Sequence, residues 1–198
     1  MNPRSVPVMP KSRRRLKRAD IVRALTRLGE LCAAQRGKVE LAIYGGTVMM
    51  FAYDCRAATK DIDAIFHPPE VVEPLIEQIA REMNLPVDWL NNGVKNFVGT
   101  REARMTFAEL QVPGLMITRP SAEYLLAMKC MAARLPTPFR AGDVADIKFL
   151  VKELAITSMK QIDAIVGDFY GGRALENGKR WLVAALLKEV SHGKKPAK

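Results

Sequence analysis

Residues 41–66 read LAIYGGTVMMFAYDCRAATKDIDAIF. An apolar run leads into the glycine pair Gly45-Gly46, and a second apolar segment, which begins fifteen residues after Gly46, carries Asp61 and Asp63. The pattern predicts a strand, a glycine turn with a short helix, and a second strand on which the two carboxylates share one face. Such acids are costly to bury unless they are paired or bind a cation, whereas on a surface strand they are simply solvated. Because Mg²⁺ is usually held by one or two carboxylates and substrate phosphates, the pair predicts a site for Mg²⁺ or Mn²⁺.

The glycine turn is compatible with phosphate binding. A helix that begins at Gly45 and Gly46 would present unpaired backbone N–H groups to an anion, and Thr47 adds a hydroxyl. The alternative is a tight turn without a ligand. The segment lacks the Gly-Lys-Ser/Thr of a Walker A loop and the Gly-x-Gly-x-x-Gly of a dinucleotide-binding fold, which excludes those two kinds of phosphate site.

The chain changes character near residues 118–120. Strand and helix patterns alternate before this point, and only helix patterns follow it, which predicts an α/β fold of the α+β kind with a helical C-terminal lobe. The expected strands cover residues 39–44, 61–66, 87–90, 106–112 and 115–118. We therefore divide the chain into a basic tail (1–18), an α/β lobe (19–118), a helical lobe (119–191) and a second basic tail (192–198).

The order of these segments resembles the nucleotidyltransferase superfamily whose best-known member is DNA polymerase β. Its pattern is an apolar strand, Gly-Gly or Gly-Ser, a short helix, Asp-x-Asp on the next strand and a third carboxylate on a later strand. Residues 56–63, RAATKDID, are also similar to the Arg-x-x-Thr-x-Asp-x-Asp form of bacterial members. The resemblance implies a nucleotidyltransferase fold with a mixed sheet flanked by helices. In this fold Asp61, Asp63 and a third acid would hold two Mg²⁺ ions, while Gly45–Thr47 would contact the phosphates of an NTP.

Two residues compete for the place of the third carboxylate. Asp88 lies in the segment LPVDWL (85–90), where it is either the third acid or a cap or turn residue. Glu109 lies on the expected strand 106–112. We favour Asp88 as the third catalytic and metal-binding acid, with Glu109 as its rival.

A second resemblance involves a lysine inside an apolar helix. Residues 124–134 read YLLAMKCMAAR, and residues 143–147 read DVADI. These segments resemble the nucleotidyltransferase toxins of type IV abortive-infection toxin–antitoxin systems, and more closely a family of small, largely uncharacterised bacterial nucleotidyltransferase-like proteins. The resemblance implies that Lys129 contacts the nucleotide phosphates and that Asp143 or Asp146 positions it. The alternative is an ion pair between helices, in which Lys129 or Arg134 neutralises the two aspartates.

The positive charge of the chain is confined to its two ends. The seven Lys and Arg residues of 1–18 and the three of 192–198 equal the net charge of +10, so the residues between them are neutral overall. Both ends lack acids and are expected to be disordered. They are either arms that bind RNA through phosphate contacts or solvated tails without a defined role.

Other features exclude several functions. No apolar run approaches the ~20 residues of a transmembrane helix, and three scattered cysteines and two histidines fit neither a disulfide framework nor a histidine metal site.

We expect a cytoplasmic protein with no membrane partner that transfers NMP from an NTP, such as ATP, to a hydroxyl acceptor. RNA, such as a tRNA 3′ end, is the first candidate acceptor, in a toxin-type enzyme. The alternatives are a protein or small-molecule hydroxyl, or a non-catalytic module that binds a cognate antitoxin or another protein.

Overall fold

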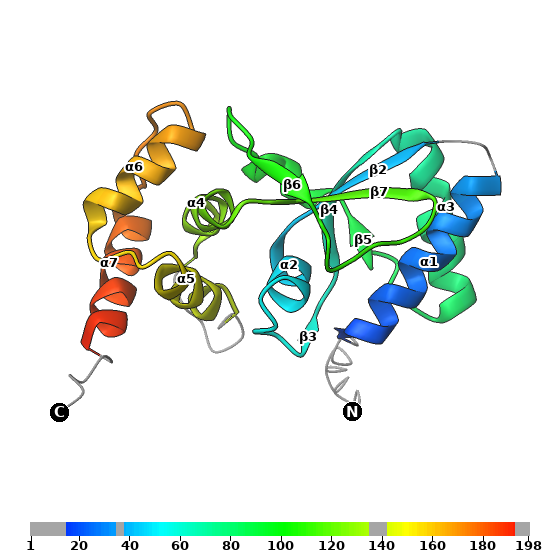
Figure 1. The fold of residues 1–198 in the computed structure, drawn as a ribbon, viewed down its shortest axis with the longest axis horizontal. Helices are drawn as coiled ribbons and strands as arrows, with labels where there is room; N and C mark the ends of the chain where they lie inside the picture. Colours follow the sequence, from blue (N-terminus) through cyan, green and yellow to red (C-terminus); the bar gives the residue numbers. More distant parts are fainter. Residues whose placement is uncertain (1–14, 35–37, 135–141, 193–198) are drawn as a thin grey trace, which may run out of the picture.

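The computed structural model describes residues 15–34, 38–134 and 142–192 (Figure 1). Most of both predicted basic tails, residues 1–14 and 193–198, lies outside these ranges. Within them, no helix is both long and apolar enough to cross a membrane.

A five-stranded mixed sheet forms the centre of the N-terminal half. Its order is β5 (Leu90–Asn91), β4 (Ile62–His67), β2 (Val39–Ile43), β7 (Leu115–Pro120) and β6 (Arg104–Thr106). β2 runs parallel to β7 and antiparallel to β4, whereas β5 is parallel to β4 and β6 is antiparallel to β7. The α+β class, with a mixed sheet and flanking helices, is therefore confirmed.

Buried and less buried residues alternate along the strand that carries the acid pair. In β4 the side chains of Ile62, Ala64 and Phe66 are buried, whereas Asp63 between them is partly exposed. α1 (Arg18–Ala34) and α3 (Pro69–Met83) pack against each other (Figure 1) and contribute their apolar residues to the same core. Because successive side chains of a strand point to opposite faces, Asp63 points away from the face that carries these three apolar side chains.

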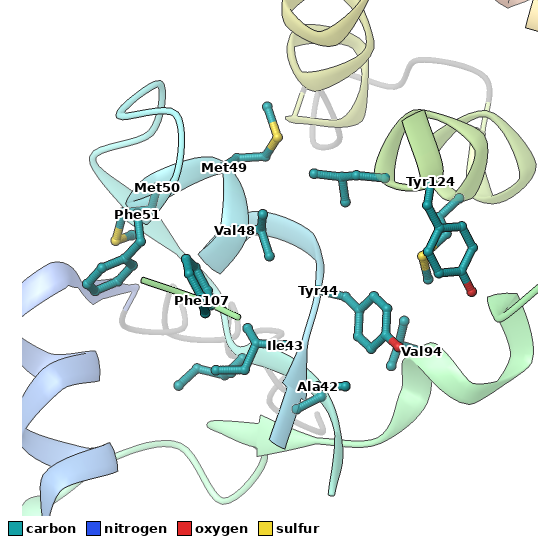
Figure 2. Close-up of a cluster of buried hydrophobic side chains, with 14 of the residues drawn as sticks. Ala42, Ile43, Tyr44, Val48, Met49, Met50, Phe51, Val94, Phe107 and Tyr124 are labelled. Atoms are coloured by element: carbon teal, nitrogen blue, oxygen red, sulfur yellow. The ribbon is translucent and has the colours of Figure 1, made fainter. Parts of the chain in front are cut away.

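The glycine turn leads into a short helix inside the core. α2 (Gly45–Phe51) follows β2 after Tyr44, and every residue from Gly46 to Phe51 is buried. Figure 2 shows Phe51 of this helix next to Phe107, and the two rings meet edge to face with 6.3 Å between their centroids. Packing therefore fixes the turn, as expected for a rigid support of a site.

The chain before α1 is attached to the segment that precedes the acid pair. β1 (Leu16–Lys17) pairs antiparallel with β3 (Ala58–Thr59), and Leu16 is only 1% exposed. Arg18, the first residue of α1, donates hydrogen bonds to the Met50 carbonyl and to Asp54. The predicted tail boundary at residue 18 is therefore corrected, because the burial of Leu16 makes residues 16–18 part of the folded lobe.

In the described residues after β7, the regular elements are helices. They are α4 (Ala122–Ala132), α5 (Gly142–Glu153), α6 (Met159–Phe169) and α7 (Asn177–His192). The Ser121 side chain caps α4, and Ser158 caps α6 through a capping box with Gln161. α4 contacts the other three helices, and Figure 1 shows all four at the end of the molecule opposite α1. α7 includes His192, the first residue of the second predicted tail.

Two expected strands are displaced, and both displacements affect the candidates for the third carboxylate. The strand expected over 106–112 ends at Thr106, because the chain then turns and the Leu110 N–H donates to the Phe107 carbonyl. The strand expected over 87–90 begins only at Leu90, after a turn closed by the Trp89 N–H and the Pro86 carbonyl. Both rivals, Asp88 and Glu109, consequently lie in turns rather than on strands.

Candidate active site

The glycine turn and the acid pair lie against each other. Gly45 has a positive φ of 63°, which favours glycine, and a Cβ at this position would collide with the carboxylate of Asp63. The backbone N–H of Tyr44 donates to the Asp63 carbonyl at 2.8 Å, which joins the end of β2 to β4. A glycine at position 45 therefore allows the backbone to turn and allows the Asp63 carboxylate to approach it closely.

Asp61 directly precedes β4 and Asp63 is its second residue, at the end of the strand that pairs with β5. Asn91 of β5 is in register with Asp63, and its Nδ2 donates to Oδ2 of Asp61 at 3.2 Å. Burial, together with the charge of Asp61, raises the pKa of Asp63 to about 6. The ionised form of Asp63 is therefore costly to bury, and a bound cation would reduce that cost.

Among the residues that the structure describes, no third acid joins this pair in a group that could hold a metal ion. Asp88 lies in the turn before β5, where its carbonyl accepts a hydrogen bond from Asn91, and Glu109 lies 3.5 Å from Arg119. Across the described ranges, no three His, Cys, Asp or Glu side chains form a group that could hold a metal ion. Asn91, an amide, occupies the strand position next to Asp63.

The other predicted phosphate-contacting residues of the turn are enclosed. Gly46 packs so closely against Thr59 that a Cβ would clash with its hydroxyl, and the Cβ would also be in tight contact with Arg56. Thr47 is fully buried, and its hydroxyl has no hydrogen-bond partner in the described part of the protein. Of the predicted turn, only Gly45 therefore reaches the cavity described next.

A cavity of about 300 Å³ lies between the sheet and the C-terminal helices. Four predicted site residues line it, namely Gly45, Asp63, Lys129 and Asp143, while much of the remaining wall is apolar and comes from α4 and the 3-10 helix η1 (Gly93–Phe97). Small-molecule sites have volumes of about 300–1,000 Å³ and combine apolar walls with a few polar groups. The cavity therefore has the size and composition of a small-ligand site.

Lys129 is held at this cavity by two aspartates of α5. Its Nζ lies 3.1 Å from Asp143 and 2.8 Å from Asp146, which is 1% exposed. Both oxygens of Asp146 also accept hydrogen bonds from Arg56, from Nε and Nη2 at 2.7 Å each. Burial acts to lower the pKa of Lys129, but the charges of Asp146 and Asp143 raise it above its usual value. The ion pair predicted as the alternative role of Lys129 is thus present.

Arg56 and Tyr44 are among the residues of this region that the sequence analysis did not single out. Arg56 connects the loop after α2 to α5. Tyr44 lines the cavity, and its hydroxyl donates to Glu102 at 2.9 Å. Arg56 stands in the Arg-x-x-Thr-x-Asp-x-Asp segment, which was a signal for it. Tyr44 had no comparable signal, because an aromatic residue at the end of an apolar strand is usually a packing residue.

Two carboxylates are a set of ligands that a single divalent ion commonly uses. Mg²⁺ usually takes one or two carboxylates and completes its shell with water and substrate phosphates. Asp61 and Asp63 would supply such a set, and burial is the main cause of the raised pKa of Asp63. Comparisons of the chain with protein-family models, curated proteins and solved structures gave no match. A function must therefore be inferred from the residues themselves.

Proposed function

We propose that the protein is a Mg²⁺-dependent nucleotidyltransferase that transfers NMP from an NTP to a hydroxyl acceptor. The observation that carries the proposal is the meeting of Asp63, Gly45 and Lys129 at one cavity of ligand size. An NTP site needs a carboxylate that holds the metal ion, a backbone that the phosphates can approach closely, and a cation that binds the phosphates. The superfamily resemblance of the sequence gives the same assignment.

Asp61 and Asp63 would hold the divalent ion, Mg²⁺ or Mn²⁺. When bound, the ion would polarise the NTP phosphates and lower the pKa of the attacking hydroxyl. Asn91 would orient Asp61 through its side-chain hydrogen bond. The absence of a side chain at Gly45 would let a phosphate approach the backbone beside the acid pair.

Lys129 would bind the β- and γ-phosphates by exchanging one of its two partners. The Asp143 side chain is 43% exposed, so Lys129 can leave it for a phosphate at little cost. Asp146 is buried and held by Arg56 through both oxygens, so it would keep Lys129 at the cavity during the exchange. In this arrangement Asp143 is the exchangeable partner and Asp146 is the positioning residue.

RNA is the acceptor that we propose, such as a tRNA 3′ end in a toxin-type enzyme. β1 pairs with β3 at Leu16 and Thr59, and Thr59 is two residues before Asp61. The basic N-terminal segment therefore joins the folded protein beside the acid pair, where its charges would favour a phosphate backbone near the metal. A hydroxyl of a protein or a small molecule is the competing acceptor.

A non-catalytic module is the second candidate function. The observation that favours it is Asn91 beside Asp63, together with the lack, over the residues that the structure describes, of a three-acid group that could hold a metal. Such a module would bind a nucleotide or a partner protein, such as a cognate antitoxin, without transferring NMP.

The test is a labelling screen. Purified protein is incubated with Mg²⁺, each of the four labelled NTPs in turn, and total cellular RNA and protein, and the label is then traced. We expect label in RNA with wild type and none with a variant that combines Asp61→Ala and Asp63→Ala. Equal labelling by the variant would refute the proposed site, and no labelling under any condition would favour the non-catalytic module.

A further inference from the structure

Phe97 is a cavity-lining aromatic residue that the hydrophobic core does not use. Its side chain is partly exposed, and it is not among the hydrophobic side chains that form the core or pack against it. Other rings, such as those of Phe51 and Tyr124, pair with an aromatic neighbour, whereas Phe97 has no such neighbour in the described ranges. The ring is therefore available to a ligand in the cavity.

The backbone holds Phe97 in place. It is the last residue of η1, which packs against both β4 and α4. The Tyr170 hydroxyl donates a hydrogen bond to the Phe97 carbonyl, which connects η1 to the end of α6. A ring on a fixed backbone loses little freedom on binding and is suited to stacking.

The cavity lining combines charged and apolar groups, as a nucleoside triphosphate does. Its charged side chains are Asp63, Lys129 and Asp143, which suit a triphosphate with a divalent ion. The apolar side chains that line the cavity together with Phe97 include Leu125 and Met128 of α4, both buried. We propose that Phe97 is the platform on which the nucleobase of the NTP stacks, an inference that rests on the proposed nucleotidyltransferase function.

The same lining offers little to distinguish one base from another. Outside the charged set, Tyr44 is the only lining side chain of the described residues with a hydrogen-bonding group, and its hydroxyl already donates to Glu102. Stacking tolerates any base because every base has a π face. Apolar pockets discriminate between ligands by only about 10- to 200-fold, whereas hydrogen-bonding sites reach about 10⁴-fold or more. The affinities of the four NTPs should therefore lie within about 200-fold of one another.

The test measures binding by calorimetry with Mg²⁺ present, for ATP, GTP, CTP, UTP and inorganic tripolyphosphate. Phe97→Ala should weaken all four NTPs by about 5- to 150-fold and leave tripolyphosphate affinity unchanged, and Phe97→Trp should restore NTP binding. Lys95→Ala is the control, because Lys95 is exposed on the same helix and does not line the cavity. Circular dichroism verifies that each variant is folded.

The outcomes separate this inference from the proposed function. Any of three results would overturn the stacking role while nucleotide binding stands. Phe97→Ala could leave the NTP affinities unchanged, it could weaken tripolyphosphate as much as the NTPs, or the wild-type affinities of the four NTPs could differ by more than about 200-fold. A wild-type protein that binds neither NTPs nor tripolyphosphate would overturn both.

Discussion

Replacing Asp63 with asparagine should stabilise the metal-free protein by an amount that depends on pH. Burial and the charge of Asp61 raise the pKa of Asp63 from 3.8 to about 6. One pKa unit corresponds to about 1.4 kcal/mol, so the ionised carboxylate destabilises the folded state by about 3 kcal/mol above pH 7. The penalty disappears at low pH, where the carboxyl is protonated in both the folded and the unfolded states, and it amounts to about 1 kcal/mol at pH 4.5.

Asparagine cannot ionise, so the Asp63→Asn variant lacks this penalty at every pH. Its free energy of unfolding relative to wild type should therefore increase by about 2 kcal/mol between pH 4.5 and pH 8. The comparison of the two pH values cancels any pH-independent effect of the amide. The assay is urea denaturation in the presence of a chelator, and Glu73→Gln on the exposed side of α3 is the control for the loss of one carboxylate. A stability difference that is the same at both pH values would refute the reasoning.

The same two proteins should also differ in how much Mg²⁺ stabilises them. If Asp63 is a ligand, Mg²⁺ should stabilise wild type at pH 8 by about 2.7 kcal/mol at a hundredfold excess over its dissociation constant. The Asp63→Asn variant should gain much less, because it has lost one of the two carboxylates. Equal stabilisation of both proteins would place the ion elsewhere.

Three further predictions concern the surroundings of the acid pair. Asp146→Ala removes the buried carboxylate that two cations share, so it should lower the free energy of unfolding by about 3–5 kcal/mol in a urea titration. The control Asp168→Ala breaks an exposed ion pair and should lower it by less than about 1 kcal/mol. Equal losses in the two variants would contradict the importance of burial. Gly45→Ala introduces a clash with the acid pair and should reduce NMP transfer at least about tenfold, while Gly178→Ala, with open space around its Cβ, should leave transfer unchanged. Removing residues 1–14 should weaken RNA-dependent transfer strongly at about 50 mM salt and little at about 200 mM; activity that is unchanged at every salt concentration would remove the support for RNA as acceptor.

The local part of the candidate site follows from the sequence because short-range rules determine it. The alternation of apolar and acidic residues around Asp63 sets which face of β4 each side chain occupies. The positive φ of Gly45 is a conformation that favours glycine, so the glycine itself indicated the turn. The class of fold and the helical C-terminal part were predictable for the same reason.

The parts that depend on long-range packing were not predictable in this way. Arg56 and Asp146 are 90 positions apart in the chain, and no local pattern indicates that they share a hydrogen-bonded ion pair. Asp88 and Glu109 lie in turns because hydrogen bonds close the chain at these points, which periodicity does not reveal. The burial of Thr47 results from the packing of α2 into the core and likewise has no signature in its neighbours.

The most direct test of nucleotidyl transfer by the acid pair follows the fate of two phosphates. Each NTP is supplied in two preparations, labelled at the α- or at the γ-phosphate, with Mg²⁺ and RNA. We predict that wild type incorporates the α label into RNA and releases the γ label as pyrophosphate, and that the combined Asp61→Ala and Asp63→Ala variant does neither. Incorporation of the γ label, or undiminished incorporation of the α label by the variant, would contradict the proposal.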